Sequence, residues 1–79
     1  MNINNAIYLS ALRGKNVVVV ARHFEHAENA FLSMRRHLDE QGLEYETRNY
    51  DKRVKLPNDC WIRFDTHYRD GFDGEVFHL

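Results

Sequence analysis

The 79-residue chain has one cysteine, one proline, four glycines and no long hydrophobic run. With a single cysteine, no disulfide can form within the chain, and the lone thiol fits a reducing compartment, so we expect the cytoplasm. No apolar stretch approaches the roughly 18 residues of a membrane span. The start, Met1-Asn2-Ile3-Asn4-Asn5, has no basic segment leading into an apolar one, as a signal peptide does. We therefore expect no membrane contact.

Neither sign of charge is in excess, since 11 Lys and Arg stand against 12 Asp and Glu, for a formal net charge of -1. Nucleic-acid-binding domains usually carry a basic face, which this balance does not favour. A chain of this length forms one domain, residues 1–79, that buries only about 60% of the surface its unfolded form exposes. Because such a core is small, a homodimer is one route to more buried area.

Four consecutive valines define the most informative stretch of the sequence. They lie in a strand predicted over residues 16–21, and they have no polar alternation. Such a run is typical of a strand that is covered on both faces, as parallel strands of α/β sheets are. A first helix precedes it, with Ile3, Ala6, Ile7, Ser10 and Ala11 on one stripe, and Gly14 ends that helix.

The second helix has the clearest pattern in the chain. Its apolar residues recur at steps of three and four, which predicts one buried stripe. Gly42 ends this helix, and Leu43 is placed to make the hydrophobic contact beyond it. The stripe consists of Phe24, Ala27, Phe31, Met34 and Leu38.

Beyond residue 43 the pattern changes from a period of 3.6 to a period of two. Strands are predicted over 44–50, 54–56, 60–64 and 75–79, with a charged turn at 51–53 and a polar loop at 65–74. Pro57-Asn58-Asp59 is a strong turn signal, so 54–64 forms a hairpin. The order α-β-α-β-β-β-β predicts an α/β fold, a small mixed sheet packed with two helices.

Parts of this pattern resemble a known family. A helix leads through Gly14-Lys15-Asn16 into the valine strand, an alanine-rich helix follows, and Ile62-Arg63-Phe64 precedes a glycine-containing loop at 71–74. This arrangement resembles part of the P-loop ATPase core of phage large terminases and helicases, which implies an α/β sheet. However, Gly14-Lys15-Asn16 has no upstream glycine and no Ser or Thr after the lysine, and it precedes a strand instead of a helix. ATP hydrolysis is therefore carried over to no residue.

Two groups of residues could carry chemistry, and both are better explained by structure. His23 and His26 lie three residues apart at a helix start, but zinc needs three or four converging ligands. Cys60 could pair with a histidine as a nucleophile. Since Cys60 shares a strand face with Ile62 and Phe64, a small buried hydrophobic role is favoured. We expect no catalytic residue, no cofactor and no metal.

Basic side chains form a second candidate group, which could contact phosphates. Trp61, Tyr45, Tyr50 and Tyr68 could then stack bases, as sheet-faced RNA binders do. Neighbouring acidic residues dilute the charge, so nucleic-acid binding is the alternative reading. The candidate phosphate contacts are Arg35, Arg36, Lys52, Arg53 and Lys55.

Protein contact is the favoured use of the exposed aromatic and arginine side chains, which dominate interface energies. The candidate partner-binding residues are Trp61, Arg63, Tyr68, Arg69 and Phe72. The competing interpretation is that the first helix covers this face of the sheet. We therefore expect a non-enzymatic interaction protein, of the sort that small phage or prophage genes encode, which binds and modulates or inhibits a larger complex.

Overall fold

The computed structural model describes residues 3–68 and 72–79. It confirms the α/β class and the predicted order of two helices and five strands, a single strand lying between the helices. A short 3-10 helix, η1 (Asn49–Asp51), adds one turn between the second and third strands. The elements are α1 (Ile3–Leu12), β1 (Val17–Val20), α2 (Phe24–Glu40), β2 (Glu46–Arg48), β3 (Arg53–Lys55), β4 (Trp61–Asp65) and β5 (Glu75–His78).

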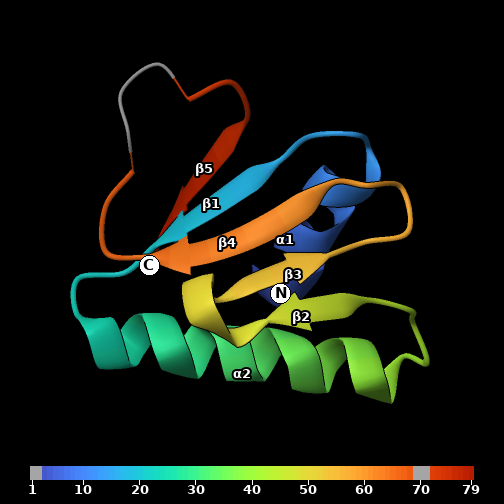
Figure 1. Ribbon diagram of the computed structural model, residues 1–79, viewed down its shortest axis with the longest axis horizontal. Coiled ribbons are helices and arrows are strands. Elements are labelled where there is room, and N and C mark those ends of the chain that lie inside the picture. Colours follow the sequence, from blue (N-terminus) through green and yellow to red (C-terminus); the bar gives the residue numbers. More distant parts are fainter. Residues whose placement is uncertain (1–2, 69–71) are drawn as a thin grey trace.

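The five strands form one mixed sheet in the order β2-β3-β4-β1-β5 (Figure 1). The strand β1 lies between β4 and β5 and is parallel to both. The strand β3 is antiparallel to β2 and β4. The predicted hairpin around Pro57 is therefore confirmed, and the valine strand lies inside the sheet.

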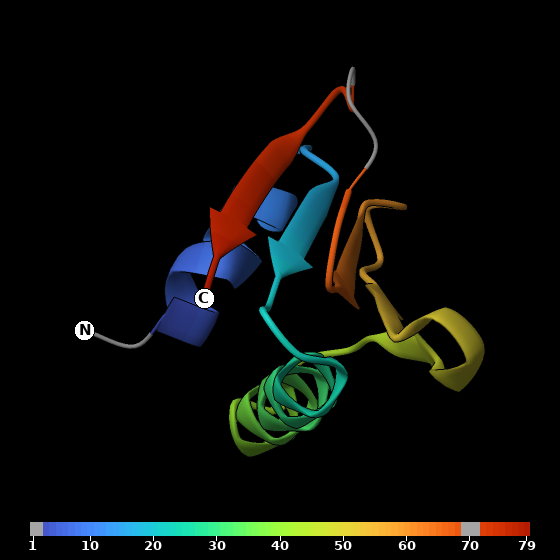
Figure 2. The same cartoon turned by 90° about the vertical axis from the view of Figure 1, so that its left-hand side faces the viewer.

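Both helices pack on the same face of the sheet (Figure 2). Alternate strand residues point to this face, where they meet the buried side chains of α1 and α2 in one hydrophobic core. Neither helix in the described ranges is long and apolar enough to cross a membrane. The core consists of Ile7, Ala11, Val17, Val19, Ala21, Ala27, Phe31, Met34, Leu38, Val54, Leu56, Ile62 and Phe64.

The predicted ends of the helices are confirmed. Gly42 has φ +67° and Gly14 has φ +100°, a left-handed backbone that glycine adopts without a steric penalty. The backbone N–H of Leu43 donates to the carbonyl of Leu38 at 3.0 Å, and the Leu43 side chain packs against the core. The helix α2 thus ends in a Schellman-type turn with the expected hydrophobic contact.

The predicted stripe of α2 is right at four of its five positions and wrong at Phe24, which is 64% exposed. Phe24 is the first residue of the helix. Its ring lies under the Lys52 ammonium group, 4.0 Å from the ring centroid, instead of entering the core. A periodic pattern alone does not say where along a helix the contact with the sheet begins.

The strand predicted over 44–50 is shorter in the structure, since β2 covers only Glu46–Arg48. The chain then turns through η1, and Lys52 adopts φ +50° before β3 begins. All three residues of β2 are exposed. A longer strand at this edge would therefore gain almost no stabilisation from burial.

Candidate binding surface on the open sheet face

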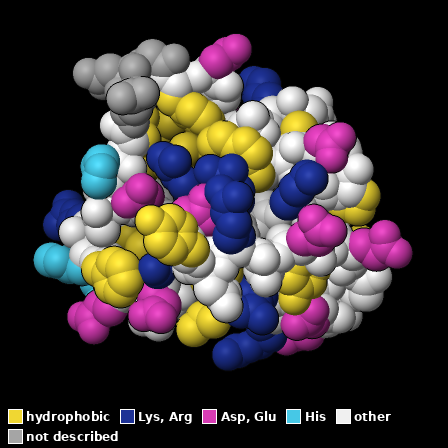
Figure 3. Space-filling model, in the orientation of Figure 1, with side chains coloured by type: hydrophobic (Ala, Val, Ile, Leu, Met, Phe, Trp, Pro, Cys, Tyr) yellow, Lys and Arg dark blue, Asp and Glu magenta, His cyan; other side chains and the backbone are white. Residues whose placement is uncertain are grey.

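Within residues 3–68 and 72–79, no helix or strand covers the face of the sheet opposite to α1 and α2 (Figure 2). We call this the open face, and it is the face turned to the viewer in Figure 3. The interpretation that α1 covers Trp61 and Arg63 is therefore wrong. Their strand neighbours Ile62 and Phe64 point to the helices, so Trp61 and Arg63 point away from them.

Three arginines form a row across adjacent strands of the open face. Arg48 pairs with Arg53 in the β2–β3 register, and Arg53 pairs with Arg63 in the β3–β4 register. The row continues to Val18 of β1 and Val76 of β5. Figure 3 shows Lys and Arg side chains gathered in the middle of this face, beside hydrophobic ones. We call Arg48, Arg53 and Arg63 the arginine row.

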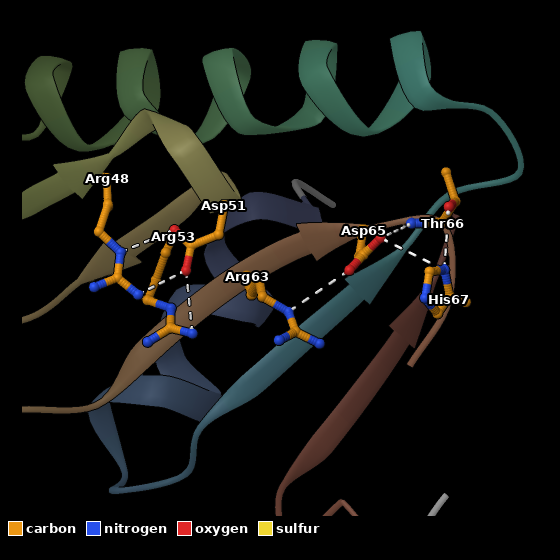
Figure 4. A network of polar contacts seen from close by, with 7 residues as sticks. All are labelled: Arg48, Asp51, Arg53, Arg63, Asp65, Thr66 and His67. Carbon is orange, nitrogen blue, oxygen red and sulfur yellow. Dashed lines mark hydrogen bonds and ion pairs between the residues drawn. The ribbon is translucent and has the colours of Figure 1, made fainter. Parts of the chain in front are cut away.

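Two carboxylates partly neutralise the arginine row (Figure 4). Asp51 accepts hydrogen bonds from Arg48 at 2.8 and 3.2 Å, and its carboxylate lies 3.2 Å from an Nη atom of Arg53. These hydrogen bonds from Arg48, with the charge of Arg53, lower the pKa of Asp51 below its usual value despite partial burial. Asp65 lies 3.8 Å from Nε of Arg63. Three guanidinium groups thus face two carboxylates.

The guanidinium groups of Arg53 and Arg63 are not fully bonded. Their Nε atoms are buried, and neither has a hydrogen-bond partner in the described part of the chain. Both groups lie over the ring of Trp61 instead. The distance from Cζ to the ring centroid is 4.8 Å for Arg53 and 5.9 Å for Arg63. Such cation–π contacts hold the two arginines in place, and Asp51 pairs with one terminal nitrogen of Arg53.

Trp61 lies at the centre of an aromatic and cationic cluster. Its ring packs against Phe72, with the ring centroids 5.7 Å apart. Its backbone N–H donates to the side-chain oxygen of Asn16 at 3.1 Å. Since the backbone carbonyl of Asn16 also accepts from the N–H of Glu75 at 3.0 Å, Asn16 joins the starts of β4 and β5. Trp61 is half-buried and offers an anchored aromatic edge.

The five predicted partner-binding residues do not all come together. Trp61, Arg63 and Phe72 share one cluster. Tyr68 lies beyond the other end of β4 and packs against the ring of His78, 6.1 Å between centroids. Arg69 lies outside the described residues.

The predicted phosphate contacts divide among three places. Arg53 and Lys55 lie on the open face. The ammonium group of Lys52 lies over the ring of Phe24. Arg35 and Arg36 belong to α2, on the other side of the sheet, where Arg35 stacks on the ring of Phe31 at 5.6 Å.

A shallow hollow of about 730 Å³ brings Arg35 and Lys55 to one rim. Four carboxylates share that rim, those of Asp39, Glu44, Glu46 and Asp59, so a phosphate would meet more negative than positive charge there. A second hollow, of about 420 Å³, lies on the open face itself. Its lining has three cationic and two anionic side chains, so positive charge is in slight excess there. The lining residues are Glu46, Thr47, Arg48, Arg53, Lys55, Asp59 and Trp61.

The two other candidate chemistries lie away from the open face. The rings of His23 and His26 are 5.3 Å apart, and over the described ranges no three His, Cys, Asp or Glu side chains could hold a metal ion together. Cys60 packs against the core, in line with the predicted hydrophobic role.

Sequence reasoning did not single out Arg48, nor the joining of Arg48, Arg53 and Arg63 into one row. The available signal is the alternation within 46–48, 53–55 and 61–63, where a charged or aromatic residue occurs at every second position. That alternation assigns each residue to a face but does not say which residues are neighbours across strands.

No protein-family model, no curated protein and no solved structure matches this chain. The resemblance to P-loop ATPases thus stays a prediction, and the open face described above does not depend on it.

Proposed function

We propose that this chain is a non-enzymatic interaction protein that binds a larger protein complex through its open face and modulates or inhibits it. We place it in the cytoplasm and among the small proteins that phage or prophage genes encode. The observation that carries the proposal is the half-buried Trp61, packed with Phe72, Arg53 and Arg63 on a sheet face that no described element covers.

The composition and rigidity of this cluster support a protein interface. Tryptophan and arginine are the residues that most often carry binding energy between proteins, and they act best when held in place before binding. Here Asn16 holds the Trp61 backbone, and the indole ring holds the two guanidinium groups. A partner would therefore meet side chains that lose little conformational entropy on binding.

A nucleic-acid-binding accessory module is the second candidate function, and the arginine row is the observation that favours it. Two features weigh against it. Asp51 and Asp65 lie among the arginines, and the Trp61 ring that would stack a base already contacts Phe72 and two arginines. Binding that falls steeply with salt and is shared by unrelated DNA or RNA sequences would favour this second function.

The proposal is tested by capture from the native host, with the double substitution Trp61→Ala and Arg63→Ala. Because these residues form the centre of the cluster, we expect partner capture to fall at least about tenfold, a loss typical of hot-spot residues. Circular dichroism and thermal unfolding check that the domain still folds, as both side chains are half-buried.

The matched control is Leu32→Ala with Arg36→Ala, an apolar residue and an arginine on the exposed side of α2. This pair should leave capture unchanged. Equal capture by the wild type and the Trp61/Arg63 variant, or loss of capture in the control, would contradict the proposal.

A further inference from the structure

The arginine row is unfavourable to the fold that contains it. Like charges that are direct neighbours across strands destabilise a sheet, and here two such pairs follow one another, Arg48 with Arg53 and Arg53 with Arg63. Asp51 and Asp65 offset part of this repulsion. Three guanidinium groups against two carboxylates leave one positive charge of the row unbalanced. The row therefore carries more positive charge than its neighbouring carboxylates neutralise, which points to an anionic ligand.

The geometry of the row limits the form of that ligand. Adjacent strands lie about 4.8 Å apart, so the three arginines follow one another at this spacing across the strands. On an α-helix, side chains at i, i+4 and i+7 follow one another at about 5–6 Å. On an extended segment, side chains of one face are about 6.8 Å apart. Carboxylates on one face of a helix match the row better than those of an extended segment.

Beyond the arginines the same line across the sheet becomes apolar. Arg63 is followed by Val18 and then by the half-buried Val76, with Trp61 and Phe72 beside them. Val18 is fully buried. A ligand that lies along this line would therefore meet cations over β2, β3 and β4, and the half-buried Val76, Trp61 and Phe72 as its hydrophobic contacts. An amphipathic segment with an acidic part and an apolar part complements both halves.

We infer that the partner presents an acidic, amphipathic α-helix, which lies across the open face along the arginine row. This inference rests on the proposed function and names the chemistry of the bound segment. The helix would place glutamate or aspartate side chains at i, i+4 and i+7 against Arg48, Arg53 and Arg63. Guanidinium groups bind carboxylates in a bidentate manner, which would fix the register of the helix.

Two other occupants are less favourable. A second copy of the chain, in a two-fold contact centred on the row, would bring arginine rows of like charge together. A nucleic-acid strand would run its phosphates past Asp51 and Asp65 and would find the Trp61 ring already in contact with Phe72.

The test uses the full chain and four synthetic probes in an NMR titration. The first probe is a capped alanine-based helix with glutamates at i, i+4 and i+7 and leucines further along the same face. The second has the same composition with the glutamates distributed around the helix. The third carries lysine in place of glutamate, and the fourth is a ten-nucleotide oligothymidylate.

We expect the first peptide to bind about tenfold more tightly than the second, from three exposed ion pairs worth a fraction of a kcal/mol each. Its binding should shift the guanidinium signals of Arg48, Arg53 and Arg63 and the backbone N–H signals of β2, β3 and β4, and the lysine peptide should not bind. Arg53→Glu should abolish this binding, whereas the matched reversal Arg36→Glu, on α2, should leave it unchanged.

Three results would overturn the inference: equal affinity for the two glutamate peptides, tighter binding of oligothymidylate than of the first peptide, or no binding of any probe. If one of these occurs while Trp61→Ala with Arg63→Ala still prevents partner capture, the acidic helix is wrong and the protein-binding function stands. If capture does not depend on Trp61 and Arg63, the proposed function itself fails.

Discussion

At the scale of single residues, Trp61 connects the fold of this chain to its open face. Its backbone N–H donates to the side chain of Asn16, whose carbonyl also accepts a hydrogen bond from the N–H of Glu75. Its ring contacts the guanidinium groups of Arg53 and Arg63 and the ring of Phe72. The position of the indole therefore depends on contacts made by β3, by β4 and by the segments just before β1 and β5.

Gly74 is the residue whose substitution tests this arrangement. A Cβ atom built at Gly74 would lie 2.5 Å from the Phe72 ring and even closer to the backbone carbonyl oxygen of Asn16. Gly74→Ala must therefore displace both the ring and the backbone of Asn16, or shift the backbone at position 74 itself. We expect a loss of about 1–3 kcal/mol in the free energy of unfolding, the usual result of overpacking, measured by urea denaturation.

The neighbouring substitution Asp73→Ala is the control, since Asp73 is exposed. It should leave the free energy of unfolding almost unchanged. A Gly74→Ala variant as stable as the wild type, with unchanged Trp61 fluorescence, would show that the start of β5 does not hold Phe72 against the indole.

At the scale of elements, the 3-10 turn η1 brings Asp51 between the first two arginines of the row. Hydrogen bonds from Arg48 lower the pKa of Asp51, burial opposes this shift, and the charge of Arg53 adds to it. The folded state thus favours the ionised carboxylate. Its contribution to stability is present above the unfolded-state pKa, about 4, and is lost as the pH falls through the lower folded-state value.

The variant Asp51→Asn should remove this pH dependence. It leaves Arg48 and Arg53 without their shared carboxylate, so the free energy of unfolding should fall at neutral pH and change less than that of the wild type on acidification below pH about 4. Denaturation at a series of pH values measures both effects.

Asp59→Asn is the matched control for Asp51→Asn. Asp59 pairs with Lys55 at 3.5 Å, but its side chain is 87% exposed, and asparagine tolerates its backbone φ of +71°. Identical pH profiles for the Asp51→Asn variant and the wild type would show that Asp51 does not stabilise the arginine row.

The elements differ in how far the sequence predicts them, and the reason is the range of the interactions that form them. The valine strand, the Gly42 helix end and the Pro57 hairpin follow from neighbouring residues, and all three are found in the structure. The expectation that both faces of the valine strand are covered by helices is wrong, since both helices lie on one face of the sheet (Figure 2). The length of β2 and the exposure of Phe24 depend on contacts with distant segments. So does the arginine row, because a strand register is set by long-range pairing.

At the scale of the whole molecule, the main feature is a two-layer fold with both helices on one side of the sheet (Figures 1 and 2). The sequence indicates that Trp61 is a candidate binding residue. It does not indicate whether a helix covers the sheet face that carries Trp61 or leaves that face open. Nothing in the local pattern of α1 says to which face of a sheet it returns. The structure decides it, since Ile7 and Ala11 share a core with Val17, Val19 and Ile62.

The most direct test of the binding surface is hydroxyl-radical footprinting of the chain alone and in complex with the partner captured from its native host. Side chains buried by the partner should become less reactive. We predict that Trp61 and Phe72 are oxidised in the free chain and protected in the complex, while Leu32 on α2 stays equally reactive in both. Protection of Leu32 with unchanged oxidation of Trp61 and Phe72 would place the partner on the helical side and contradict the account.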